Sequence, residues 1–136
     1  MEFKVDFITY EGIYKTLMSE KLNVPTSEGR RTILSNHMPI IMPLQIGVVE
    51  TLENKQLKHY AINNAVLYFS SNVAEIVADS VIDVEDINIE DAIKDKEDAE
   101  NNLKKTKREY EKIRDINKLE VANNLIAAAR KYLNQQ

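Results

Sequence analysis

Few residues in this chain have side chains that could carry chemistry. Histidine, which titrates near neutral pH and is the commonest metal ligand, occurs only at positions 37 and 59. His37 and His59 occupy the kind of loop and strand positions in which histidine is usually structural. The chain has no cysteine, so thiolate nucleophiles, thiolate metal sites and disulfides are excluded. We therefore predict neither a catalytic residue nor a metal site.

The charged clusters give no stronger chemical signal. Asp83–Asp91 holds several carboxylates, but scattered acidic residues before a helix are typical of a solvated segment that complements the helix dipole. The stretch Lys104–Arg114, KKTKREYEKIR, includes glutamates and is interpreted as helix surface rather than as a nucleic-acid patch. A net charge of −4 and a pI near 5.3 give no general attraction to phosphates or anionic lipid.

Motifs for phosphate binding and nucleophilic catalysis are absent from the sequence. The chain contains no GxxxxGK[ST], no GxGxxG and no GxSxG, so it lacks the turns that cradle phosphates or present a nucleophile. We therefore expect a non-catalytic protein without a cofactor, which leaves binding and structural roles.

The first half of the chain has the composition of a β-protein. All three glycines and all three prolines lie within the first 47 residues. Short segments rich in β-branched and aromatic residues follow one another up to residue 83, and asparagines at Asn54, Asn63-Asn64 and Asn72 supply left-handed turn positions. This pattern predicts an antiparallel β-sandwich or flattened barrel over residues 1–83. Its expected core consists of Phe3, Val5, Phe7, Ile33, Leu34, Val66, Leu67, Phe69, Ile76 and Val77.

The second half, residues 84–136, has the composition of a helical segment. It contains no glycine or proline and is rich in Ala, Leu, Glu and Lys. Asn88 is the predicted N-cap of the first helix. Two apolar stripes are out of phase, which predicts a break between Arg114 and Lys118 and hence a helical hairpin, with one long bent helix as the alternative. The residues expected to pack the hairpin, together with Ile113, are Ala92, Ala99, Leu103, Tyr110, Leu119, Ala122, Ile126, Ala129 and Leu133. The predicted fold class is therefore α+β, with strands and helices in separate halves.

The segment GRRTILSNHMPI, Gly29–Ile40, mixes arginines, a histidine and apolar residues, and its context resembles a known family. The run VPTSEGRRTILSNHMPIIMPLQIG, the start from Phe3 to Tyr14, the pair AINNAVLYFSSNVAEIVADS and the Ala-rich tail together resemble the epsilon subunit of F-type ATP synthases, called delta in mitochondria. The resemblance covers essentially the whole chain. The order VPT-x-EG, IL-x-x-HxP and then glycine is its most specific part.

This resemblance implies a non-catalytic subunit in the rotating central stalk of an ATP synthase. In that family the sandwich contacts the gamma subunit and the loops of the membrane ring of c subunits, and the hairpin can extend into the catalytic head of alpha and beta subunits and inhibit ATP hydrolysis. The implied gamma contact is His37, Met38, Pro39 and Ile40. The implied ring contact is Glu28, Arg30 and Arg31.

Several positions depart from the family pattern. Tyr10 replaces a proline, Thr32 a glycine, and Asn63-Asn64 the usual Gly-Gly turn. Some bacterial members bind ATP in the hairpin, but the matching region here, DINKLEVANN, has Val121 or Glu120 at the arginine position, so ATP binding is not expected. At Arg30 the family commonly carries an acidic residue that faces the ring.

The reversed charge at Arg30 leaves two alternatives open. The chain could be the equivalent subunit of a specialised F-type-like ATPase that is not coupled to an ordinary c-ring. It could also be an unrelated sandwich binding module with a coiled-coil tail. The start, MEFKVDFITYEG, lacks the features of a signal peptide. We expect a cytoplasmic protein that lies at the inner face of the membrane as part of a complex.

Overall fold

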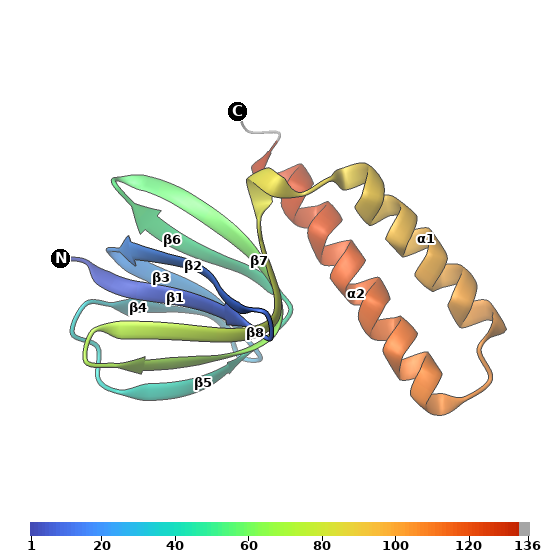
Figure 1. Cartoon of the computed structure of the whole chain (residues 1–136), viewed down its shortest axis with the longest axis horizontal. Coiled ribbons are helices and arrows are strands. Elements are labelled where there is room, and N and C mark those ends of the chain that lie inside the picture. The colour runs from blue at the N-terminus through green and yellow to red at the C-terminus, as the bar shows by residue number, and fades with distance from the viewer. Residues whose placement is uncertain (134–136) are drawn as a thin grey trace. The chain divides into compact units, whose positions relative to one another are not determined.

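The computed structural model describes residues 1–133 of the chain. The chain divides into two compact units, Met1–Asp83 and Val84–Gln136, and Figure 1 shows strands in the first and helices in the second. The predicted fold class is therefore confirmed.

The first unit is an eight-stranded sheet that encloses its own core. Its strands are β1 (Phe3–Thr9), β2 (Gly12–Ser19), β3 (Lys21–Thr26), β4 (Gly29–Leu34), β5 (Ile40–Leu44), β6 (Gly47–Glu53), β7 (Gln56–Ser70) and β8 (Val73–Asp83). The strand order is β2-β1-β8-β7-β6-β3-β4, and β5 also pairs with β7. All pairs are antiparallel except β1 with β8, so the sheet is mixed rather than purely antiparallel. One buried cluster receives side chains from every strand.

The long strand β7 runs through the turn position predicted at Asn63-Asn64. Asn63-Asn64 does not form a turn, although Asn64 has the positive φ, 23°, that was expected there. Instead, these residues mark the point where β7 changes partner: Gln56–Ile62 pairs with β6, and Ala65–Phe69 pairs with β5. The left-handed backbone predicted at Asn54 and Asn72 is confirmed, with φ of 50° and 59°.

The predicted core is correct at most positions and wrong where two apolar residues are adjacent on a strand. Ile33 and Ile76 are buried, but Leu34 is 58% exposed and Val77 is 42% exposed. Val66, beside the buried Leu67, is half-buried. Successive side chains on a strand point to opposite faces, so only one residue of each pair can enter the core. The remaining predicted core residues, Phe3, Val5, Phe7 and Phe69, are buried.

The second unit is a helical hairpin, as predicted. After a short 3-10 turn, η1 (Val84–Asp86), come α1 (Ile89–Lys105) and α2 (Glu109–Tyr132), which lie side by side in Figure 1. The Asn88 side chain accepts hydrogen bonds from the backbone N–H groups of Glu90 and Asp91, which confirms it as the N-cap of α1.

The predicted position of the break between the helices is wrong. Residues 114–118 are helical, and the chain turns at residues 106–108. Asp115 explains the error because it is fully buried in phase with the apolar positions of α2. Positions 115, 119, 122, 126, 129 and 133 are spaced by three and four, so the α2 stripe begins at a carboxylate that an apolar pattern does not register.

Most residues of the predicted hairpin stripes face the helix contact. The buried members are Ala92, Ala99, Ala122, Ile126 and Ala129, and the half-buried members are Leu103, Leu119 and Leu133. The prediction that Tyr110 and Ile113 pack the hairpin is wrong. Both belong to α2, and they are 63% and 67% exposed.

Candidate functional site

The loop between β4 and β5 contains His37, Met38 and Pro39, leads into Ile40 at the start of β5, and is fixed by an asparagine of the β7–β8 turn. The backbone N–H of Asn36 donates to Oδ1 of Asn72 over 2.6 Å, and Nδ2 of Asn72 donates to Oδ1 of Asn36 over 3.0 Å. Asn36 itself has left-handed backbone, with a φ of 67°. Asn72 had been predicted only as a turn residue, and nothing in the sequence indicates that it holds this loop in place.

Within this loop, His37 is partly covered and Met38 projects outward. The His37 ring stands edge-on to Phe69 at a centroid distance of 6.0 Å, and its Nδ1 lies 2.7 Å from the carbonyl oxygen of Met38. Met38 is 72% exposed, and Pro39 is exposed beside it. The loop therefore presents a fixed, largely apolar surface.

A row of apolar residues crosses the outer face of five neighbouring strands. The strand registers place them side by side in the order Ile13, Ile8, Val77, Val66 and Pro43, on β2, β1, β8, β7 and β5. Each is exposed or half-buried. We call these five residues the outer apolar row. The sequence signal for it was the adjacent apolar pairs, such as Phe7-Ile8 and Ile76-Val77, whose second members point outward.

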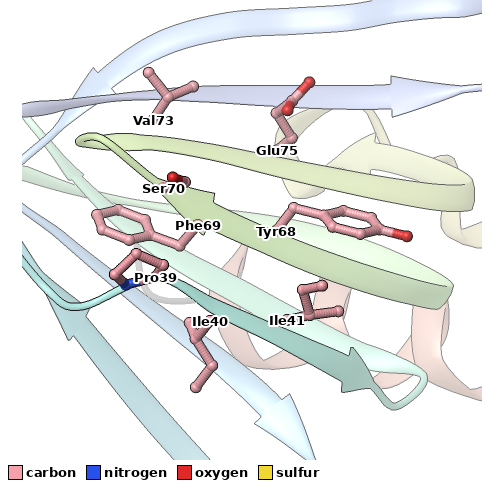
Figure 2. Close-up of a pocket in the computed structure, with 8 residues that line it drawn as sticks. All are labelled: Pro39, Ile40, Ile41, Tyr68, Phe69, Ser70, Val73 and Glu75. Atoms are coloured by element: carbon pink, nitrogen blue, oxygen red, sulfur yellow. The ribbon is translucent and has the colours of Figure 1, made fainter.

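A hollow of about 400 Å³ on β5, β7 and β8 joins this outer face to the loop. Figure 2 shows the Tyr68 side chain between Ile41 and Glu75, in agreement with the strand registers. Ile41 is 69% exposed. The residues that line the hollow are Pro39, Ile40, Ile41, Tyr68, Phe69, Ser70, Val73 and Glu75. Loop, hollow and outer apolar row together form a surface suited to protein contact.

The other predicted contact residues are Glu28, in the β3–β4 turn, and Arg30 and Arg31, at the beginning of β4. All three are exposed. The Arg30 guanidinium does not pair with Glu28. Its Nε donates to Oδ1 of Asn23 over 2.6 Å, and a second nitrogen donates to the Asn23 carbonyl over 3.3 Å. Asn23 therefore fixes the direction of the Arg30 positive charge.

The two groups of predicted contact residues do not form one site. Arg30 and Arg31 lie at the beginning of β4, and His37–Ile40 follow its end. A strand advances about 3.3 Å per residue, so the six residues of β4 separate the groups by roughly 20 Å. They can therefore contact different parts of an assembly.

The most strongly perturbed group of the strand unit belongs to an internal polar network. The Tyr60 hydroxyl donates to Oε2 of Glu53 over 2.8 Å and accepts from Nζ of Lys15 over 3.1 Å. Burial, followed by the neighbouring Glu53 carboxylate, raises the pKa of Tyr60. The Lys15 ammonium lies 3.8 Å from Oδ2 of Asp83. Because Tyr60 is fully buried and hydrogen-bonded on both sides, this network stabilises the fold.

His59 is likewise paired within the sheet. Its Nε2 lies 2.9 Å from Oε2 of Glu50, and Nζ of Lys21 lies 3.2 Å from the other carboxylate oxygen. Burial alone would raise the pKa of Glu50, but the hydrogen bonds from His59 and Lys21 outweigh it, and the pKa is lowered. Within residues 1–133, no group of three or more histidine and acidic side chains is arranged to hold a metal ion. None of the helices in that part of the chain is long and apolar enough to span a membrane.

Comparison with known proteins gives one consistent family. The family model "ATP synthase, Delta/Epsilon chain, beta-sandwich domain" matches residues 2–84. The ATP synthase epsilon chain of Lactobacillus helveticus is 33% identical over 124 residues, which cover 88% of this chain and 84% of the relative. The epsilon chain of Latilactobacillus sakei is 30% identical over 134 residues, which cover 89% and 92%.

Two solved assemblies contain chains of the same fold. A chain in the mitochondrial ATP synthase of Euglena gracilis, solved as OSCP, F1 and c-ring, matches with a TM-score of 0.77 and 20% identity, covering 93% of this chain and 81% of that one. A chain in the central stalk and c-ring of the Tetrahymena thermophila mitochondrial ATP synthase matches with a TM-score of 0.64 and 12% identity, covering 95% and 97%.

The fold and its outer face thus define a sandwich-and-hairpin protein with an apolar contact surface on its sheet. The chain belongs to the delta/epsilon chain family of ATP synthase. Its relatives are epsilon chains, which are non-catalytic subunits of that enzyme.

Proposed function

We propose that this protein is a central-stalk subunit of a rotary ATP synthase, held at the inner face of the membrane by its partners. The observation that carries the proposal is the relationship to epsilon chains over 88% of the sequence, sandwich and hairpin included. The two structural neighbours, which belong to assemblies that contain a c-ring, support the same role.

The gamma subunit is the proposed partner of the surface formed by the His37–Ile40 loop, the hollow and the outer apolar row. This surface presents apolar side chains from five strands, and such contiguous exposed apolar area is typical of protein contact sites. Asn72 fixes the loop before binding, which lowers the conformational entropy lost on association.

Arg30 and Arg31 are the proposed contacts toward the c-ring, or toward a protein that replaces it. The resembling family commonly has an acidic residue at the Arg30 position, whereas here Asn23 holds a guanidinium in place. Like charges facing each other across an interface can cost several kcal/mol. We therefore propose that the partner surface at this turn is acidic, which fits either a ring with an acidic loop or a substitute for the ring.

The helical hairpin is the proposed regulatory element, acting on ATP hydrolysis through transient contact with the alpha and beta subunits of the catalytic head. Its buried stripe consists largely of alanine, so the helix contact buries little apolar area per residue. Isolated helices of this length are only marginally stable in water. A partner that binds one arrangement of the hairpin more tightly can therefore shift the equilibrium between its arrangements.

Purification of the native complex tests the stalk assignment directly. Gamma should be recovered in stoichiometric amount, and deletion of residues 86–136 should preserve gamma binding while changing ATPase activity or its inhibition. Loss of gamma binding on this deletion would show that the hairpin is required for assembly. Recovery without any gamma-like chain would favour the unrelated binding module.

Charge reversal tests the partner at the β3–β4 turn. Arg30→Glu combined with Arg31→Glu should weaken attachment to the ring-side partner, most clearly at low salt, and leave gamma binding intact. An unchanged or tighter complex with an ordinary ring would disprove the acidic-partner proposal.

A further inference from the structure

Glu75 is an unpaired acidic side chain in the middle of the outer face. It lies between Asp6 on β1 and Tyr68 on β7 in the strand registers. Among the residues that the structure describes, no lysine, arginine or histidine lies within ion-pair distance of its carboxylate. Glu75 is exposed, so water solvates the charge in the free protein.

The nearby charged groups are already engaged with one another. Oδ1 of Asp6 accepts a hydrogen bond from the Thr16 hydroxyl over 2.6 Å, and its other carboxylate oxygen lies 3.5 Å from Nζ of Lys4. Lys4 is opposite Val73 rather than Glu75 in the register. Lys4, on the strand next to β8, therefore pairs with Asp6.

The surroundings of Glu75 are otherwise apolar. Val73 and Val77 flank it on the same face of β8, and Tyr68 and then Ile41 follow it across the sheet. Figure 2 shows the Glu75 carboxylate turned away from the Tyr68 ring, on the opposite side from Ile41. A protein that covers this face removes water from the carboxylate. Because an unpaired buried charge is strongly unfavourable, a covering surface that supplies a positive charge is strongly favoured.

We propose that the gamma segment that docks on this face carries a lysine or arginine that pairs with Glu75, beside an apolar side chain that enters the hollow. This inference rests on the proposed function, since it specifies the chemistry of the partner at the same surface. The hollow of about 400 Å³ accommodates at least one large apolar side chain. Glu75, at its edge, then fixes the register of the segment through one charge-assisted contact.

The test measures the affinity of the full chain for the purified gamma subunit of the same organism. Glu75→Gln removes the charge and keeps the shape of the side chain. Glu20→Gln is the matched control, because Glu20 is an exposed acid in the turn between β2 and β3. Ile41→Ser tests the docking surface itself, without altering any charge.

We expect Glu75→Gln to weaken binding at least tenfold and to reduce its dependence on salt, because a desolvated charge pair is broken. Glu20→Gln should stay within twofold of the wild type, and Ile41→Ser should weaken binding. All these positions are exposed, and circular dichroism checks that each variant remains folded.

Three outcomes would overturn the inference. If Ile41→Ser weakens binding but Glu75→Gln does not, gamma docks on this face without a cation at Glu75. If the two glutamate variants weaken binding equally, a general attraction to acidic surface is responsible. If neither Ile41→Ser nor Glu75→Gln has an effect, gamma docks elsewhere and the proposed docking surface fails as well.

Discussion

The contact between Thr106 and Asp115 should control the stability of the helical hairpin. The Thr106 hydroxyl lies 3.0 Å from Oδ2 of Asp115 and 2.6 Å from the Asn102 carbonyl oxygen. Within residues 1–133, the other carboxylate oxygen of Asp115 is buried without a hydrogen-bond partner, and Nε of Arg114 lies 3.7 Å from it. The single hydroxyl proton of Thr106 is shared between the Asp115 carboxylate and the Asn102 carbonyl oxygen. Among the described residues, Thr106→Val therefore removes the hydroxyl that lies within hydrogen-bond distance of the buried carboxylate.

The expected cost follows from this geometry. A buried acceptor that loses its partner costs about 1–3 kcal/mol, which corresponds to a roughly 5- to 150-fold increase in the equilibrium constant for opening the hairpin. Asp115→Leu should not destabilise the hairpin. Leucine completes the apolar stripe of α2, and the Thr106 hydroxyl and backbone N–H still donate to the Asn102 carbonyl oxygen. Replacing a buried charged group by an apolar one is often neutral or stabilising.

Hydrogen exchange of α1 and α2 amides in the full chain, at fixed neutral pH, measures this opening. Thr106→Val should reduce protection, Asp115→Leu should retain or increase it, and the double variant should resemble Asp115→Leu, since the substitutions are coupled. Exchange from β8 provides the internal control. Equal loss of protection in both single variants, or additive losses in the double variant, would refute the reasoning.

Three further predictions concern the strand unit. Residues 1–83 expressed alone should give a cooperative thermal transition, because their core lies within this segment; an insoluble or molten product would contradict this. Tyr60→Phe should lower the free energy of unfolding by about 1–3 kcal/mol in urea titrations, because Glu53 and Lys15 lose a partner. Since the folded-state pKa of Tyr60 is raised, the wild type should lose stability as the pH rises above about 10, and the variant should lose less. Because the folded-state pKa of Glu50 is lowered, the stability it contributes should be present above about pH 4.3 and lost as the pH falls further, so Glu50→Gln should flatten stability against pH there.

The sequence was sufficient to predict the two halves of the chain, because each has one dominant period and its own turn residues. It could not distinguish the inward from the outward member of adjacent apolar residues. Ile33-Leu34 and Ile76-Val77 read as uniform core, yet Leu34 and Val77 are exposed. Strand pairing decides which member is buried, and single-sequence patterns do not contain that pairing.

The candidate contact surfaces were only partly accessible to sequence reasoning. His37 and Arg30 could be singled out by resemblance, but their fixed orientations depend on Asn72 and Asn23, which lie 35 and seven residues away in the chain. Asp115 was missed for a related reason. The buried Asp115 carboxylate accepts a hydrogen bond from the Thr106 hydroxyl in the turn before α2. Neither residue is apolar, so a search for apolar periodicity does not detect the pair.

The strand β7 also determines how force can pass through this protein. It pairs along one edge with β6 and then β5, while β8 pairs with it along the other edge. A force on β5 beside His37 is therefore transmitted through the backbone hydrogen bonds between β5 and β7 to one continuous fifteen-residue strand, and not through side-chain contacts alone. The same strand reaches β6, so torque applied at the outer face loads both parts of the sheet together. In the proposed central-stalk role, this arrangement limits elastic deformation between the two proposed contact surfaces.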